Sequence, residues 1–167
     1  MPKMIFLCVS NEATAICPCC GHILYYRDSR IRIRKMYGGN KSKLLIRRMK
    51  CSYCKRLHNE LPDILTPYKH YATEVIENVV DEIIDPDDPF SENYPCETTM
   101  NRWKNWILRN THQIDGSLKS IGHRILGFSE RLLKSSVSLL TELREAGAGW
   151  LSVILHVIYN SGGFLPA

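Results

Sequence analysis

The chain has 167 residues, a formal net charge of +5 and an apolar content of 44%. This length fits one ordinary domain or two small ones, and it is too short for a DNA-reading region joined to a full nuclease or transposase catalytic domain. No segment approaches the roughly 18–20 apolar residues that span a bilayer. The apolar run at residues 5–9 is more typical of a strand than of a secretory signal, so we expect a cytoplasmic protein with no membrane partner.

The charges are distributed unevenly along the chain. Residues 15–62 contain twelve Lys and Arg but two acids, whereas residues 74–97 contain nine acids and no Lys or Arg. Such an excess of cations is typical of proteins that contact a polyanion, because Lys and Arg neutralise phosphates and release their counterions. The sequence therefore predicts a nucleic-acid surface in the N-terminal part of the chain.

Two Cys-x-x-Cys pairs lie in the basic segment. Thiolates separated by two residues can reach adjacent corners of a tetrahedral zinc ion from one tight turn, and Pro18 and Gly21 favour such a turn. A redox-active thiol pair would account for only one of the two pairs. Seven cysteines, an odd number, also suit a reducing compartment better than a disulfide framework. The sequence predicts one structural Zn²⁺ bound by Cys17, Cys20, Cys51 and Cys54.

The remaining cysteines and two nearby histidines receive other roles. His22 and His58 flank the pairs and could replace a cysteine ligand, but with four cysteines available we favour positions on the surface or beside the metal. Cys19 has the wrong offset for a ligand and is interpreted as a bystander or surface thiol. Cys8 and Cys96 are predicted to be small buried residues.

The basic segment has the pattern of a small antiparallel zinc ribbon. We expect a short strand at residues 4–9, a strand ending at residues 30–34, a glycine turn at residues 38–40 and a returning strand at residues 43–50. A third short strand at residues 57–61 would complete the ribbon. The apolar core of so small a unit is insufficient to hold the fold, so metal binding must supply much of its stability.

Arginine alternates with isoleucine in the first long strand. This period of two places Ile31 and Ile33 on one face and the arginines on the other. A solvated strand face could carry arginines, but the excess of cations over acids favours contact with phosphate. The residues predicted to bind the phosphate backbone are Arg30, Arg32, Arg34, Lys43, Arg47 and Arg48.

Helices are predicted after the ribbon. Residues 61–67 form a connector, and apolar residues then recur at three- and four-residue spacing over residues 68–84, with acids on the opposite, solvated face. A Pro- and Asp-rich segment at residues 85–89 ends this helix. After a short linking segment, residues 96–109 are predicted to form a second helix. The two helices would form a helix-turn-helix-like unit.

The second helix has one apolar and one polar face. Met100, Trp103 and Ile107 share the first, with Trp106 beside them. The other face carries side chains that can contact guanine or adenine edges or grip phosphate. The residues predicted to contact DNA from this helix are Thr98, Asn101, Arg102, Asn105 and Arg109.

The C-terminal part is predicted to be a helical hairpin. We expect a break at residues 112–116, with Asp115 and Ser117 as candidate helix caps, then a long helix at residues 117–145 and an apolar helix at residues 150–159. The fold class is therefore α+β. The expected units are a basic zinc ribbon (residues 1–62), a helix-turn-helix-like region (residues 63–110) and a helical hairpin (residues 111–167).

The stretch from CPCCGHILYYRDSRIRIRKMYGG through RRMKCSYCKRLHNELPDILTPYKHY to ETTMNRWKNW, about residues 15–110, resembles a group of uncharacterised bacterial proteins known as a domain of unknown function. That group is similar to the N-terminal zinc-binding and helix-turn-helix region of insertion-sequence transposases. The resemblance implies a DNA-binding accessory or regulator of a mobile element. Two features depart from the pattern: Cys96 replaces a small hydroxyl residue before the second helix, and no catalytic acidic triad follows.

These observations together predict a zinc-dependent, non-enzymatic protein that binds duplex DNA. The acids of residues 74–97 lie along one helix face and a Pro-rich loop, without a phosphate cradle or a Ser/His/Asp constellation, so catalysis is not expected. Two alternatives remain. The ribbon could instead dock or scaffold another protein, with the C-terminal helices binding a partner or a second copy, or the basic surface could bind RNA.

Overall fold

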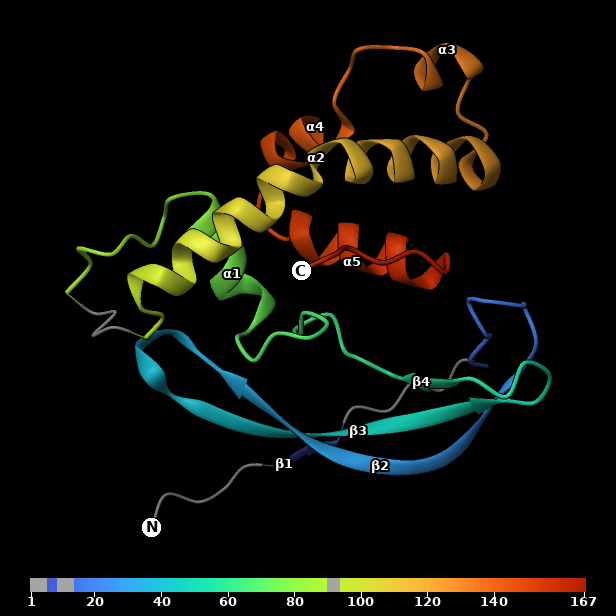
Figure 1. The fold of residues 1–167 in the computed structure, drawn as a ribbon, viewed down its shortest axis with the longest axis horizontal. Coiled ribbons are helices and arrows are strands. Elements are labelled where there is room, and N and C mark those ends of the chain that lie inside the picture. Colours follow the sequence, from blue (N-terminus) through green and yellow to red (C-terminus); the bar gives the residue numbers. More distant parts are fainter. Residues whose placement is uncertain (1–5, 9–13, 90–93) are drawn as a thin grey trace.

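The computed structural model describes residues 6–8, 14–89 and 94–167. A long curved hairpin forms one side of the molecule and helices form the other, as Figure 1 shows. The strands are β1 (Phe6–Cys8), β2 (Leu24–Lys35), β3 (Lys41–Cys51) and β4 (Leu57–Asn59). β3 pairs with β2 along its length and with β4 near its end, both antiparallel, and with β1 in parallel. The expected α+β class and antiparallel ribbon are confirmed.

A glycine turn closes the hairpin as predicted. The short 3-10 turn η1 (Tyr37–Gly39) joins β2 to β3, and Gly38 and Gly39 have φ angles of 72° and 81°. A Cβ atom on Gly39 would also lie 3.3 Å from the ring of Tyr94, just before the long helix. The left-handed backbone conformation therefore favours glycine here, and a side chain at residue 39 would also crowd the Tyr94 ring.

The arginines of β2 lie on the face of the hairpin that the rest of the chain covers. The register places Arg30 opposite Ile46 and Arg32 opposite Leu44, so each pair shares a face. Leu44 and Ile46 are completely buried and pack against Leu65 of the connector. The arginine face is thus the inner face of the hairpin.

The isoleucines of β2 occupy the outer face. Ile31 and Ile33 are 55% and 41% exposed. The alternation correctly predicted which residues share a face. It did not predict which face the rest of the chain covers, because that depends on the packing of Leu44 and Ile46 of β3 against Leu65 of the connector.

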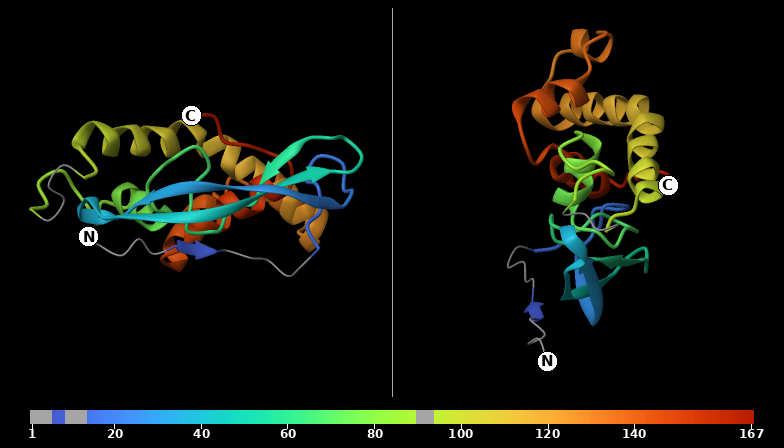
Figure 2. Two further views of the ribbon diagram at one scale, coloured as in Figure 1. Left: turned by 90° about the horizontal axis from the view of Figure 1, so that it is seen from below. Right: turned by 90° about the vertical axis from the view of Figure 1, so that its left-hand side faces the viewer.

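The helices build one apolar core. They are α1 (Thr73–Val80), α2 (Glu97–Leu126), α3 (Glu130–Leu133), α4 (Leu139–Ala146) and α5 (Trp150–Asn160). Buried side chains of α1, α2 and α5 make up most of this core, with Met100, Trp103 and Ile107 among them as expected. Figure 2 shows that α2 changes direction partway along its length, so that its two halves are not collinear. Within the described residues, no helix is long and apolar enough to cross a membrane.

The connection between α1 and α2 is not a short turn. Residues 81–96 separate the two helices, and their described part contains no helix or strand. A helix-turn-helix motif joins its helices through about three or four residues. The expectation of a short turn between the two helices is therefore wrong, because residues 81–96, which include the Pro- and Asp-rich segment, separate them.

The predicted break at residues 112–116 is also wrong. α2 continues through it and across the boundary expected at residue 110, although Gly116 costs an exposed helix interior roughly 1 kcal/mol. Burial of Ile114 and Leu118 outweighs that cost. Asp115 does not cap its own helix, and its Oδ1 instead accepts a hydrogen bond from the backbone N–H of Leu140 at 2.8 Å.

α2 ends where a glycine allows a left-handed turn. Gly127 has a φ angle of 69°, and the backbone N–H of Phe128 donates to the carbonyl of Gly122 at 3.1 Å. A Cβ atom on Gly122 would lie 2.2 Å from the Phe128 ring. The expected long helix at residues 117–145 is therefore wrong, since residues 117–126 belong to α2 and two shorter helices follow.

The sequence predicts that the acids of α1 lie on a solvated face, and for Glu77 this prediction is wrong. Glu77 is 4% exposed, and its carboxylate accepts hydrogen bonds from the backbone N–H groups of Gly149 (2.6 Å) and Leu151 (2.9 Å). Asp81 accepts a hydrogen bond from the indole N–H of Trp150 at 2.6 Å. These acids fix the start of α5 against α1 and are structural.

Candidate metal centre and basic surface

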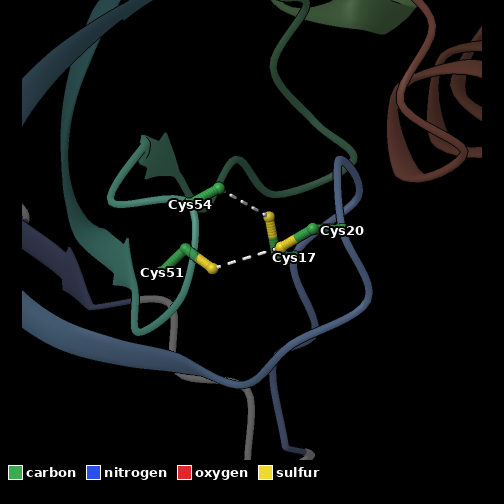
Figure 3. Close-up of side chains that lie close together, drawn as sticks. All are labelled: Cys17, Cys20, Cys51 and Cys54. Atoms are coloured by element: carbon green, nitrogen blue, oxygen red, sulfur yellow. Dashed lines mark hydrogen bonds between the residues drawn. The ribbon is translucent and has the colours of Figure 1, made fainter.

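Four cysteine side chains converge at the end of the hairpin. Figure 3 shows them pointing toward one another from two turns, one before β2 and one after β3. The Sγ atoms of Cys17 and Cys54 are 3.7 Å apart and those of Cys20 and Cys51 are 3.5 Å apart. Zinc–sulfur bonds of about 2.3 Å at tetrahedral angles require sulfur–sulfur distances of roughly 3.8 Å. The cluster predicted from the sequence therefore has the dimensions of a zinc site.

The two turns repeat one backbone conformation. The N–H of Cys17 donates to the carbonyl of His22 at 2.8 Å, and the N–H of Cys51 donates to the carbonyl of Arg56 at 3.0 Å. The residue after the second cysteine is left-handed in both turns, with φ 74° at Gly21 and 62° at Lys55. The first turn thus has the residue that this conformation favours, and the second turn carries strain.

The thiols differ in how readily they ionise. Burial opposes ionisation of Cys51, but backbone N–H groups of Tyr53 and Cys54 and the neighbouring thiols lower its pKa to about 6. At Cys54 the backbone N–H of Arg56 favours the thiolate, yet burial and the neighbouring thiols raise the pKa to about 12. Zinc binding must therefore displace protons from part of the cluster.

The surroundings close the site on one side. Cys17 and Cys51 are buried and pack with Leu24 and Met49. The Nε2 atom of His58 lies 3.3 Å from the Sγ of Cys17, so this imidazole borders the cysteine cluster.

Other cysteines follow the predictions only in part. Cys19 is exposed, as predicted, and its Sγ accepts a hydrogen bond from Arg56 at 3.4 Å. Together with Cys17 and His58 it forms a second, less buried group of three close metal-ligand atoms. Cys96 is exposed, so its predicted burial is wrong; it precedes α2 and contacts Thr99 at 3.3 Å. The side chain of Cys8 lies outside the described residues.

Two of the predicted phosphate contacts are engaged within the protein. Arg47 binds both carboxylate oxygens of Glu60, at 2.5 and 2.8 Å, and Arg48 binds both oxygens of Asp28. Arg48 holds the pKa of Asp28 below its usual value. The two acids of the basic segment therefore neutralise two of its arginines, which no local pattern revealed because the partners are far apart in sequence.

The other ribbon cations have different surroundings. Arg34 donates to the hydroxyl of Ser42 at 3.1 Å, while Arg30 is exposed on the inner face and Lys43 is half-buried on the outer face. Arg32 is half-buried, and its Nη2 donates to the carbonyl of Lys69 at 3.2 Å. The structure therefore does not gather these residues into one continuous ladder.

All five residues predicted on α2 lie on its exposed side. Acids of α2 are confined to Glu97 at its start and Asp115, which is bonded to Leu140. The exposed strip between them carries two arginines and several amides and no carboxylate of α2 itself, and Glu82, which precedes α2, pairs with Lys104 at 3.1 Å. The side chain of Arg109 lies along the helix and donates to the carbonyl of Asn105 at 3.2 Å.

Lys69 was not singled out from the sequence. Its Nζ lies 4.2 Å from the centroid of the Trp106 ring on α2, and its carbonyl accepts the hydrogen bond from Arg32 on β2. Burial lowers its pKa. The segment of residues 67–70 thus places a cation between the ribbon and α2. Its sequence, Pro-Tyr-Lys-His, was the only local pattern from which such a role for Lys69 could have been predicted.

The family described as a domain of unknown function (DUF6431) matches residues 17–103, so the chain belongs to that family. The match begins at the first cysteine of the cluster and ends within α2, and it contains all four clustered cysteines. No curated protein and no solved structure matches the chain. Membership of an uncharacterised family is thereby confirmed, and the resemblance to transposases stays a prediction.

Proposed function

We propose that this member of the DUF6431 family is a zinc-stabilised protein that binds duplex DNA and does not catalyse a reaction on it. The observation that carries the proposal is the exposed strip of α2. Arg and Asn side chains on a helix can reach guanine and adenine edges in the major groove. A helix of 30 residues with no carboxylate between its first turn and Asp115 suits such contact.

Zinc has a structural role in this proposal. Four thiolates complete a tetrahedral site and leave no open position for a substrate or water. The metal would fix the two turns that join β2 and β3 to the rest of the chain. The ribbon core near these turns contains few buried residues, so metal binding would supply much of its folding free energy.

The ion pairs of Arg47 with Glu60 and of Arg48 with Asp28 reduce the number of ribbon residues that can contact DNA. Arg47 and Arg48 already have carboxylate partners, so the proposed contacts with bases or phosphate come from α2, with Thr98, Asn101, Arg102, Asn105 and Arg109. Lys43 and Arg34 on the ribbon would add phosphate contacts. Lys69 lies next to α2 through Trp106 and would extend the same surface.

Selection of the zinc-loaded protein on a random pool of duplex DNA, followed by salt titration, tests this function. We expect an enriched motif and affinity that falls steeply with salt. Combined replacement of Arg102→Ala and Asn105→Ala should remove the motif preference. Arg124→Ala, which removes one exposed charge from the far end of α2, should keep it. A motif that survives in the double variant would refute the recognition role of α2.

A second candidate is a protein-docking ribbon. Exposed apolar and aromatic side chains support it, among them Ile31, Tyr25 and Tyr53, and the Tyr53 ring stacks on His22 with centroids 4.3 Å apart. Absence of DNA binding at low salt would favour this candidate, and preferential selection from an RNA pool would favour RNA. Self-association through the C-terminal region is also proposed, since Ile125 and Leu126 are each 68% exposed.

The relation to mobile elements rests on the sequence resemblance alone. The proposal for a regulator or accessory of such an element therefore depends on the selected motif. A motif that matches the ends of a mobile element would support it, whereas a motif in host promoters would favour regulation.

A further inference from the structure

A cleft of about 890 Å³ lies between the ribbon and α5. One wall comes from β2 and β4, and the other comes from α5 and from the segment that follows β4, residues 60–68. Figure 1 shows α5 on the concave side of the hairpin. The volume falls within the roughly 300–1,000 Å³ that is typical of small-molecule sites.

Two arginines on the inner face of β2 line this cleft, Arg30 and Arg32. The Nε atom of Arg32 is buried and has no hydrogen-bond partner among the described residues. The side chain of Arg30 makes no hydrogen bond or ion pair within the described part of the chain. Burial and, to a smaller extent, the charge of Arg30 lower the pKa of Arg32. Two neighbouring cations and an unpartnered N–H group favour an anionic ligand that accepts hydrogen bonds.

The acids that line the cleft do not neutralise these arginines. Glu60 is bound at both oxygens by Arg47, which lies outside the cleft lining. Asp63 lies 3.2 Å from the Nδ1 of His156 on α5. The positive charge of the arginine pair is therefore available to a ligand.

The opposite wall is largely apolar and aromatic. It includes Leu155 and Tyr159 of α5 and Tyr68, which follows the connector. Leu155 is buried, whereas Tyr68 is 84% exposed. A flat aromatic group can pack against such side chains and bury apolar surface, whereas an inorganic ion makes no favourable contact with them.

We propose that the cleft binds a small phosphate-bearing ligand of nucleotide size. Its phosphate oxygens accept hydrogen bonds from Arg30 and Arg32, and its aromatic part packs against Tyr68, Leu155 and Tyr159. This site is independent of the proposed DNA contact, because no residue of α2 lines the cleft.

Calorimetric titration of the zinc-loaded full chain with AMP, adenosine and inorganic phosphate tests the site. Arg30→Gln is the principal variant, because Arg30 has no structural partner to lose. Arg32→Gln is the second, with zinc content and circular dichroism checked, because its bond to Lys69 also supports the connector. Arg27→Gln is the matched control, since Arg27 is exposed on the same strand but does not line the cleft.

We expect saturable AMP binding that Arg30→Gln and Arg32→Gln each weaken about tenfold or more, as loss of a charge-assisted hydrogen bond implies. Arg27→Gln and the α2 double variant should bind AMP like the unmodified chain. AMP binding that exceeds both adenosine and phosphate supports a nucleotide site, whereas equal binding of AMP and phosphate would overturn it, because the aromatic part would then contribute nothing. No saturable binding of either anion, adenosine binding as tight as AMP, or equal effects of Arg27→Gln and Arg30→Gln would overturn the proposal.

Discussion

The buried carboxylate of Glu77 provides a direct test of how the helical part is held together. It accepts hydrogen bonds from the backbone N–H groups of Gly149 and Leu151 at the start of α5. The first N–H groups of a helix have no partner within the helix, and the N-terminus carries partial positive charge. A carboxylate from α1 thus caps a helix that lies far away in the sequence.

Glu77→Gln preserves the shape of this side chain but removes its charge and one of its two acceptors. The amide NH₂ would then face a backbone N–H, so one charge-assisted hydrogen bond is lost, at about 1.5–3 kcal/mol. Loss of the charge–dipole interaction adds about 0.3–1 kcal/mol. We expect a total near 3 kcal/mol, or a fall in Tm of roughly 6–12 °C for a chain of this size.

The assay is chemical and thermal unfolding of the zinc-loaded protein, followed by circular dichroism. Glu74→Gln is the control, because Glu74 is exposed on the same helix. Its effect should be about 0.5 kcal/mol or less. Equal stabilities of the Glu77→Gln and Glu74→Gln variants would show that the carboxylate does not hold α5 as described.

Three further predictions concern the ribbon. Cys51→Ser should abolish stoichiometric zinc binding by metal analysis and unfold the ribbon, and a variant with full zinc content would refute the four-thiolate site. Gly21→Ala should destabilise the zinc-loaded protein by about 1 kcal/mol because it puts a Cβ into a left-handed conformation, whereas Lys55→Gly should stabilise it by about 0.5 kcal/mol; effects of the same sign in urea unfolding would contradict the shared turn geometry. Arg48 lowers the pKa of Asp28, so this pair stabilises the fold above the ordinary Asp pKa of 3.8, and that contribution is lost as the pH falls through the lowered pKa. The stability difference between the unmodified chain and Asp28→Asn should shrink on acidification below about pH 4, and a constant difference would exclude the linkage.

The cysteine cluster could be predicted from the sequence because its geometry is mostly local. Two ligands on one turn fix half of the site, and a hairpin brings the two halves together. The alternation in β2 likewise fixed which side chains share a face, since a strand has a period of two. It could not show which face is covered, because that depends on contacts of Leu44 and Ile46 with Leu65, far along the chain.

The helical part was harder to predict for the same reason. Gly116 and Asp115 look like a helix boundary, but packing of Ile114 and Leu118 in the core continues the helix through them. The role of Glu77 depends on backbone groups of α5, and no local pattern distinguishes it from the exposed Glu74. Sequence periodicity therefore located apolar faces well and helix ends poorly.

Zinc should affect the two proposed binding sites differently, because the cysteine cluster and the helical core are separate. The buried residues around the cysteines form a cluster distinct from the large core of α1, α2 and α5. Cys17, Pro18 and β4 line the proposed phosphate cleft, so loss of the metal removes part of the wall that faces α5. The exposed strip of α2 is instead supported by the helical core. Zinc should therefore control the cleft directly, while α2 keeps its helical surface and loses only the adjoining ribbon contacts.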